Sequence, residues 1–249
     1  MQAAVGSHCV SCARGAQRST RTRRLPTGWS AAKVLVGVHV VVFLVGLISR
    51  GSVDVWQGTI GRFEYDYGLN VAFLARGEWY RLLTSGFVHF GILHLGMNMF
   101  ALWQLGRELE GPLGPTRFTL LYLSSILGGA GLVVALQVVD VPLLSQPGLQ
   151  GGASGGIFGL LGALAIGLRQ RGIPIMQTTL GPVLVINLLL TLSLQLSIGG
   201  HAGGLLAGAA AGSVLLRPRN GPAPARDLWA PIGVGCAAVL LAVAATTIA

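Results

Sequence analysis

The sequence predicts an all-α protein, a polytopic bundle of transmembrane helices. Of its 249 residues, 52% are hydrophobic and only 10% are charged, and the mean hydropathy is +0.69. Soluble domains carry about 25% charged residues. Apolar stretches long enough to cross a hydrocarbon core of about 30 Å recur along the chain. These observations exclude a soluble globular domain.

Seven stretches qualify as helical spans by length and apolar content. In chain order they cover residues 33–49, 86–106, 116–139, 154–170, 173–194, 198–216 and 229–248. The fifth contains Pro182, which a membrane helix tolerates when neighbouring groups satisfy the freed backbone. A long polar leader precedes the first span and no small-residue cleavage site follows it, so we expect an uncleaved helix. The predicted parts are a leader (1–30), a membrane domain (31–217), and a linker with the seventh helix (218–249).

The leader carries a CxxC pattern at Cys9 and Cys12, which is half of a zinc ribbon. A structural zinc takes four ligands, and the leader adds only His8 to the two cysteines. We therefore expect no bound zinc and no other cofactor, and we interpret the pattern as the remnant of a longer leader. Residues 14–28 are rich in Arg, Ser, Thr, Pro and Gly, which predicts disorder. Cys236 is too isolated to indicate a disulfide.

The basic residues predict the orientation of the spans. The net charge is +9, and thirteen of the 17 Lys and Arg residues fall on one side of the predicted membrane. The other side has the remaining four, Arg50, Arg62, Arg76 and Arg81. By the positive-inside rule the N-terminus is cytoplasmic and the C-terminus is outside. The leader has no interleaved aromatic residues, so we expect no nucleic-acid partner.

Two glycine-rich segments, residues 151–159 and 198–204, carry Ser154 and His201. Polar groups at membrane depth are costly and usually functional. Because spans two, four and six run in the same direction, Ser154, His201, His94 and Asn98 share roughly one depth in the outer leaflet. A hydroxyl and an imidazole that meet inside a bundle suggest a nucleophile and its general base.

Small residues recur every fourth position in spans four and six. The two sets are Gly155, Gly159, Ala163 and Gly167, and Gly200, Gly204, Gly208 and Gly212. Such stripes let helix backbones approach closely in lipid. One interpretation is packing alone; another is that this packing brings Ser154 within reach of His201. Ser154 at a helix start also fits a simple N-cap.

The remaining histidines divide into one functional candidate and two structural ones. His94 and Asn98 are four residues apart, so they share one helical face. At the depth of Ser154 they are candidate hydrogen-bond donors for an oxyanion, although a lone buried histidine is more often structural. We assign His89, at the membrane edge, to a hydrogen bond with the preceding loop. His39, alone on the first span, is also interpreted as structural.

These residues together resemble the rhomboid intramembrane serine proteases, from about Trp79 to Gly208. Three motifs occur in the family's order and on the expected spans. They are HxxxN at His94 to Asn98, GxSG at Gly152 to Gly155, and the histidine-glycine element at His201 to Gly204. The stretch Glu78-Trp79-Tyr80-Arg81 resembles the family's Trp-Arg loop motif, in a hairpin partly embedded in the outer leaflet.

The resemblance implies an endopeptidase of the bacterial inner membrane. Its fold would be a core of six transmembrane helices with one extra helix at the C-terminal end. Ser154 and His201 would form a dyad without an acid, and spans four to six contain no Asp or Glu. The Ser154 backbone N–H, His94 and Asn98 would bind the oxyanion, and Phe158 would pack against His201. The implied partners are single-span membrane proteins and the lipid bilayer; no oligomeric state is predicted.

Two other functions stay open. A catalytically inactive rhomboid-like protein binds transmembrane clients, but such relatives usually lack the serine or the histidine, and this chain has both. A multi-span transporter is expected to show paired internal repeats and charged ion sites at the membrane midplane. Neither of these is visible in the sequence. The sequence therefore favours the protease.

Overall fold

The structure is a computed structural model, described here for residues 30–49, 60–141, 144–145, 148–178, 181–186 and 197–248. Within these ranges it is helical, with only an isolated β-bridge. The long helices are α2 (Ala31–Ser49), α6 (Ile92–Leu113), α7 (Pro115–Val139), α8 (Ser154–Gln170), α10 (Ile198–Leu215) and α11 (Trp229–Ile248). The short ones are α3 (Arg62–Tyr67), α4 (Val71–Leu74), α5 (Arg81–Thr84), η1 (Ser85–Phe87), η2 (Ile175–Gln177) and η3 (Ala225–Leu228).

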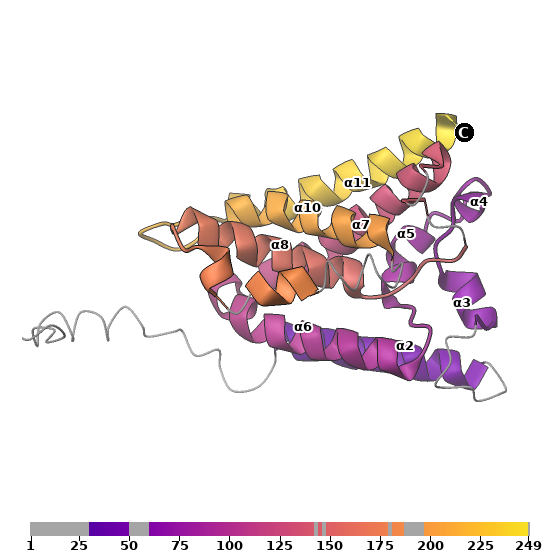
Figure 1. Cartoon of the computed structure of the whole chain (residues 1–249), viewed down its shortest axis with the longest axis horizontal. Helices are drawn as coiled ribbons and strands as arrows, with labels where there is room; N and C mark the ends of the chain where they lie inside the picture. The colour runs from indigo at the N-terminus through magenta and orange to yellow at the C-terminus, as the bar shows by residue number, and fades with distance from the viewer. Residues whose placement is uncertain are drawn as a thin grey trace, which may run out of the picture.

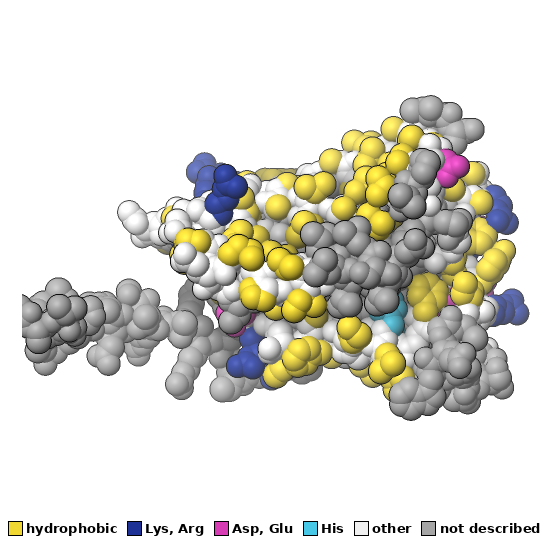
Figure 2. All heavy atoms as spheres, viewed as in Figure 1, with side chains coloured by type: hydrophobic (Ala, Val, Ile, Leu, Met, Phe, Trp, Pro, Cys, Tyr) yellow, Lys and Arg dark blue, Asp and Glu magenta, His cyan; other side chains and the backbone are white. Residues whose placement is uncertain are grey.

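The helices confirm a polytopic membrane bundle. By length and composition, four described helical segments can cross a membrane: α2, α7, α10 and the run Ala225–Thr247 that includes α11. A bent pair, Arg81–Phe87 and Ile92–Leu113, makes a fifth candidate. Helix α8 has 17 residues, which corresponds to about 26 Å at 1.5 Å per residue. Lys and Arg side chains gather at the two ends of the bundle in Figure 2, with an apolar surface between them.

The second predicted span differs from the structure at both of its ends. We predicted residues 86–106, but α6 runs from Ile92 to Leu113, and the chain bends by 94° between Phe87 and Ile92. At the polar end of α6, the carboxylate of Glu110 accepts hydrogen bonds from the backbone N–H groups of Ala31 and Ala32. It thereby caps the start of α2.

Two other predicted segments lie partly or wholly outside the described residues. Of the fifth span, residues 175–177 form η2 and residues 181–186 are helical, whereas residues 187–194 are not described. The leader before Ser30, with Cys9 and Cys12, is not described either. The predicted zinc-free leader therefore stays a prediction.

The helices form a bundle in which α7, α8 and α10 pack together and α2 pairs with α6. Figure 1 shows α2 and α6 side by side along one edge, with α3, α4 and α5 gathered at one end. Helix α11 lies against α7, where a Cβ on Gly131 would come within 2.6 Å of the Ala238 carbonyl oxygen. The seventh predicted span thus packs on the core of its own chain.

Backbone contact between α8 and α10 sets the packing at the centre. A Cβ placed on Gly204 would overlap the carbonyl oxygen of Gly155, and one on Gly208 would overlap that of Gly159. The two small-residue stripes therefore face each other directly. Only glycine permits this approach, because any side chain at these positions would push the helices apart.

We expect Gly208→Ala to lower the free energy of unfolding by about 1–3 kcal/mol, because the new methyl group overpacks the helix contact. Gly37→Ala is the matched control, since no atom lies within 4 Å of a Cβ at Gly37. The measurement is thermal unfolding of both variants in detergent. Equal melting temperatures for the two variants would contradict the close α8–α10 contact.

Candidate active site

The chain reaches α8 through a turn that is fixed on both sides. Leu69 and Gln150 exchange two backbone hydrogen bonds of 2.8 Å, and the Gly152 N–H donates to the Ser85 carbonyl oxygen at 2.9 Å. Gly152 has φ +132°, a conformation that side chains rarely adopt. A Cβ there would also lie 2.8 Å from Nε2 of His94. Glycine is therefore required both by the turn and by the neighbouring ring.

Ser154 is the first residue of α8, next to this turn. Ala153 occupies the N-cap position and makes no side-chain capping bond, so the N-cap interpretation of Ser154 is wrong. A Cβ on Gly152 would be 3.8 Å from the Ser154 Oγ and 2.8 Å from the His94 ring. The hydroxyl and this imidazole thus both lie close to Gly152.

A small cavity opens beside Ser154, between the η1 turn, α7, α8 and the start of α10. Its volume is about 40 Å³, and its lining includes Ser85, Gly129, Gly152, Ser154 and Gly200. The wall is mostly glycine and apolar, but Ser85, Gln150 and Ser197 add polar groups to it. A space of this size with several polar partners can hold water, so a water-sized space lies next to the serine hydroxyl.

His201 lies in the first turn of α10. Ser197 caps this helix, because its Oγ accepts a hydrogen bond from the Gly200 N–H at 3.3 Å. The His201 ring is buried and stacks on Phe158, with 4.1 Å between ring centroids and 10° between planes. Phe158 is one turn after Ser154 on α8, so this stack holds His201 against the helix that carries the serine. The described contacts include no hydrogen bond between Ser154 and His201.

His94 and Asn98 lie one turn apart on α6 and are joined by a hydrogen bond. The Asn98 Nδ2 donates to the His94 carbonyl oxygen at 3.0 Å, and Asn98 is buried. The His94 ring is stacked with that of Phe90, at 6.2 Å between centroids and 7° between planes. His94 is therefore held beside Gly152, and Asn98 is one helical turn further into the bundle.

His89 connects the η1 turn to the start of α8. Its Nδ1 lies 3.2 Å from the Phe87 carbonyl oxygen, and the Ala153 N–H donates to its Nε2 at 3.5 Å. Both contacts are satisfied when Nδ1 carries the proton and Nε2 accepts. His89 thus supports the backbone just before Ser154 as well as the loop that precedes α6.

The structural interpretation of His39 is confirmed, and its contacts extend this support to the first span. It is fully buried, its Nε2 lies 2.8 Å from the Tyr122 hydroxyl, and its ring stacks on Phe87 at 4.6 Å. His89 contacts the edge of the His39 ring at 5.4 Å. The available signal was a polar residue in an apolar span, since such a residue needs a partner at membrane depth.

Arg81 anchors the loop segment before α5 and does not take part in the cluster around Ser154. Its guanidinium is buried and donates to the Tyr65 and Gly68 carbonyl oxygens at 2.6 and 2.8 Å. It also pairs with Glu78 at 2.5 Å and lies over the Phe73 ring at 4.0 Å. One arginine therefore holds together residues 65–81. The hydrogen bond from Arg81 keeps the pKa of Glu78 below its ordinary value of 4.5.

Glu78→Gln is expected to lower the melting temperature at neutral pH and to have no effect in acid. A carboxylate with a lowered pKa stabilises the fold above its unfolded pKa of 4.5 and loses that contribution as the pH falls through the folded value. The measurement is melting temperature against pH for the wild type and the variant. The two curves should converge below pH 4.5.

Asp66→Asn is the control for this experiment. Asp66 pairs with Arg62 at 3.6 Å, but the Arg62 side chain is 89% exposed. Exposed ion pairs of this kind contribute at most about 1 kcal/mol. A gap between wild type and Glu78→Gln that does not shrink as the pH falls through and below the folded pKa of Glu78 would show that charge pairing is not the cause.

Comparison with known proteins gives one family. A family model described as the Rhomboid domain matches residues 76–218. Rhomboid protease GluP of Bacillus subtilis (strain 168) is 36% identical over 152 residues, which cover 59% of this chain and 28% of that protein. RHOMBOID-like protein 4 of Arabidopsis thaliana is 31% identical over 222 residues, which cover 75% of this chain and 54% of that protein.

Putative rhomboid protease YdcA of Bacillus subtilis (strain 168) is 35% identical over 131 residues, which cover 51% of this chain and 57% of that protein. The matched part is thus less than two thirds of the length of each of these relatives. The match at 76–218 contains Ser154, His201, His94 and Asn98.

Proposed function

The chain belongs to the rhomboid family, and from that premise we propose that it is an intramembrane serine endopeptidase. Ser154 is the nucleophile and His201 is its general base. The observation that carries the proposal is the stack of His201 on Phe158, one turn from Ser154, beside a cavity that Ser154 lines. The stack connects the GxSG motif on α8 with the histidine-glycine motif on α10, which are far apart in sequence.

In the proposed reaction the Ser154 Oγ attacks a peptide carbonyl while His201 takes its proton. The C–N bond then breaks and His201 returns the proton to the leaving amine, leaving an ester on Ser154. A water from the small cavity attacks this ester with the same proton transfers, releases the acid and restores the serine. Positioned acid–base catalysis of this kind contributes about 10² to 10⁴ in rate.

The oxyanion site of the proposal consists of the Ser154 backbone N–H, His94 and Asn98. Ser154 begins α8, so its N–H lacks an intrahelical acceptor and is available to a developing anion. Gly152 brings the His94 ring next to this position. Gly155 lets α8 and α10 lie close together beside this site, because a Cβ there would lie only 3.3 Å from the Gly200 carbonyl oxygen.

The proposed substrate is a single-span membrane protein, cut near the outer end of its helix in a bacterial inner membrane. Ser154 begins α8, whereas Arg169 and Arg171 lie at its other end. The positive-inside rule then places Ser154 toward the outside, with a cytoplasmic N-terminus and an outer C-terminus. The residues between 31 and 217 form the catalytic domain in this proposal.

A serine-directed fluorophosphonate is expected to label the wild-type protein and to spare Ser154→Ala, because Ser154 begins α8 next to Gly152, which also contacts the His94 ring. His201→Ala should label much more slowly, since the hydroxyl loses its base. Mass spectrometry of the labelled protein measures both effects.

The control for this experiment is Ser213→Ala, which removes an exposed serine hydroxyl on α10 that bonds the Ala210 carbonyl oxygen. It should label as the wild type does. Wild-type protein that is folded yet unlabelled would instead favour the alternative function, a catalytically inactive rhomboid-like protein that binds transmembrane clients.

Asn98→Ala is expected to lower kcat by about 10² to 10³ and to leave KM nearly unchanged, because an oxyanion donor acts mainly in the transition state. The measurement is steady-state cleavage of a single-span model substrate in detergent. Asn98→Asp is the size-matched comparison, which keeps the volume but removes the donor. Normal turnover by Asn98→Ala would show that Asn98 only bonds the His94 carbonyl oxygen.

A further inference from the structure

We propose that a cavity at the arginine-rich end of the bundle binds the phosphate of an anionic lipid headgroup. The cavity has a volume of about 740 Å³ and lies between the α6–α7 turn, the end of α8 and the linker from α10 to η3. None of its lining residues is acidic, and four of them are arginines: Arg117, Arg171, Arg217 and Arg219. This site is separate from Ser154, which begins α8 at the other end.

One carboxylate pairs with two of these four guanidinium groups. Asp227 on η3 is buried and pairs with Arg219 and, at 3.3 Å, with Arg217. Both of its partners line the cavity, and the Arg217 side chain is 46% exposed. The cluster therefore keeps an excess of positive charge that Asp227 does not balance.

The other two arginines bond only to backbone carbonyl oxygens among the described residues. Arg117 Nη2 donates to Ala223 at 2.9 Å, and Arg171 Nη1 donates to Gly167 at 2.7 Å. The Nε of Arg117 is buried and has no hydrogen-bond partner. Buried donors without a partner are rare in folded proteins, so the hydrogen-bonding capacity of Arg117 is not exhausted by its bonds to the backbone.

A lipid phosphate matches both the charge and the location. Guanidinium groups bind phosphate oxygens in a bidentate fashion. The cavity lies where α6, α8 and α10 end, which is where headgroups meet a membrane helix, and part of its wall is apolar, with Leu113, Leu215 and Leu216. Basic pockets between membrane helices bind acidic headgroups. A volume of about 740 Å³ exceeds that of a bare phosphate ion and suits a headgroup.

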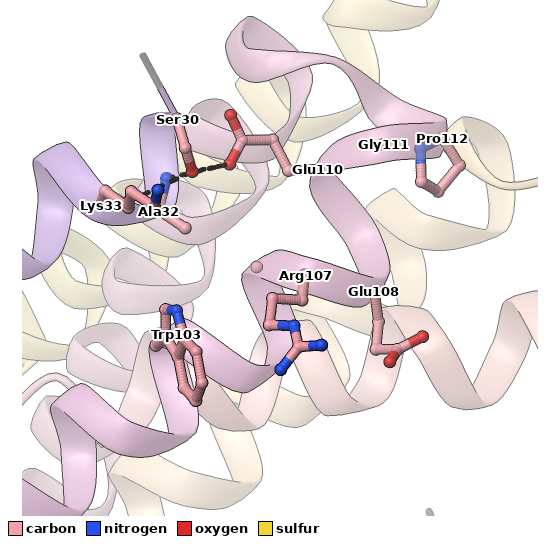
Figure 3. Close-up of a pocket in the computed structure, with 10 residues that line it drawn as sticks. Ser30, Ala32, Lys33, Trp103, Arg107, Glu108, Glu110, Gly111 and Pro112 are labelled. Atoms are coloured by element: carbon pink, nitrogen blue, oxygen red, sulfur yellow. Dashed lines mark hydrogen bonds between the residues drawn. The ribbon is translucent and has the colours of Figure 1, made fainter. Parts of the chain in front are cut away.

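A second cavity at the same end also has basic residues in its wall, but acidic residues balance their charge. It has about 630 Å³ and lies between the start of α2 and the end of α6 (Figure 3). Lys33 and Arg107 line it together with two carboxylates, Glu108 and Glu110. Glu110 is already bonded to the Ser30 hydroxyl at 2.6 Å. With two acids for two bases, this cavity offers no excess charge for an anion.

The test measures binding of three probes to the full chain in a nonionic detergent at about 150 mM salt, where charges further apart than about 8 Å are screened. The probes are phosphatidylglycerol, phosphatidylcholine and inorganic phosphate. The variant Arg117→Gln/Arg171→Gln removes two lining cations. The matched control is Arg169→Gln/Arg226→Gln, which removes the same charge from exposed arginines at the same end that do not line the cavity.

We expect the wild type and the control to bind phosphatidylglycerol equally well, and the cavity variant to bind it about tenfold or more weakly. Phosphatidylcholine and inorganic phosphate should bind at least about tenfold more weakly than phosphatidylglycerol to the wild type. If inorganic phosphate binds as tightly as phosphatidylglycerol and is weakened by the same variant, the ligand is free phosphate, and the proposal of a lipid headgroup is wrong. Equal loss in the control, or equal binding of phosphatidylcholine, would overturn the site.

Arg171→Gln alone keeps the test decisive if the double variant does not fold. The Arg171 guanidinium bonds only within its own helix turn, to the Gly167 carbonyl oxygen, among the described residues. Its loss should therefore leave the helical circular dichroism unchanged while it weakens phosphatidylglycerol binding. A folded Arg171→Gln protein with wild-type affinity for phosphatidylglycerol would also contradict the proposal.

Discussion

The backbone contact between α8 and α10 is the constraint on which the other features of the bundle depend. Lipid gives little hydrophobic drive for helix association, so close packing of small residues takes its place. The Gly155 carbonyl oxygen lies where a side chain on Gly204 would be, and Gly159 and Gly208 repeat the contact one turn further. This contact fixes the relative position of the Ser154 turn and the His201 turn. A wider helix separation would leave Phe158 too far from His201 to stack on it.

A network of aromatic and imidazole rings then fixes the serine turn from the other side. Tyr122 bonds His39, His39 contacts Phe87 and His89, and His89 accepts a hydrogen bond from the Ala153 N–H. These contacts connect α2 and α7 to the residue before Ser154. The hydrogen bonds from Tyr122 to His39 and from Ala153 to His89 thus offset part of the cost of placing these polar groups in an apolar bundle. The arrangement makes the turn rigid, which a preorganised oxyanion site requires.

The sequence predicted the parts that depend on local pattern. The bounds 154–170 for α8 and 229–248 for α11 agree with the structure, and the small-residue stripes predicted the contact between α8 and α10. The 94° bend before α6 was not predictable from hydropathy, because both sides of the bend are apolar. The bond between His39 and Tyr122 joins residues 83 apart in sequence, and the arginine cavity joins three chain segments. No local pattern carries such information.

The most direct test of the account is to map a cleavage site in liposomes that contain the protein and a single-span substrate of known orientation. Mass spectrometry of the products locates the cut and compares wild type with Ser154→Ala. We expect one cut by the wild type, near the substrate helix end that lies on the Ser154 side of the bundle, opposite the arginine cavity. We expect no cut by Ser154→Ala. A cut that persists in Ser154→Ala, or one at the arginine-rich end, would contradict the proposed function.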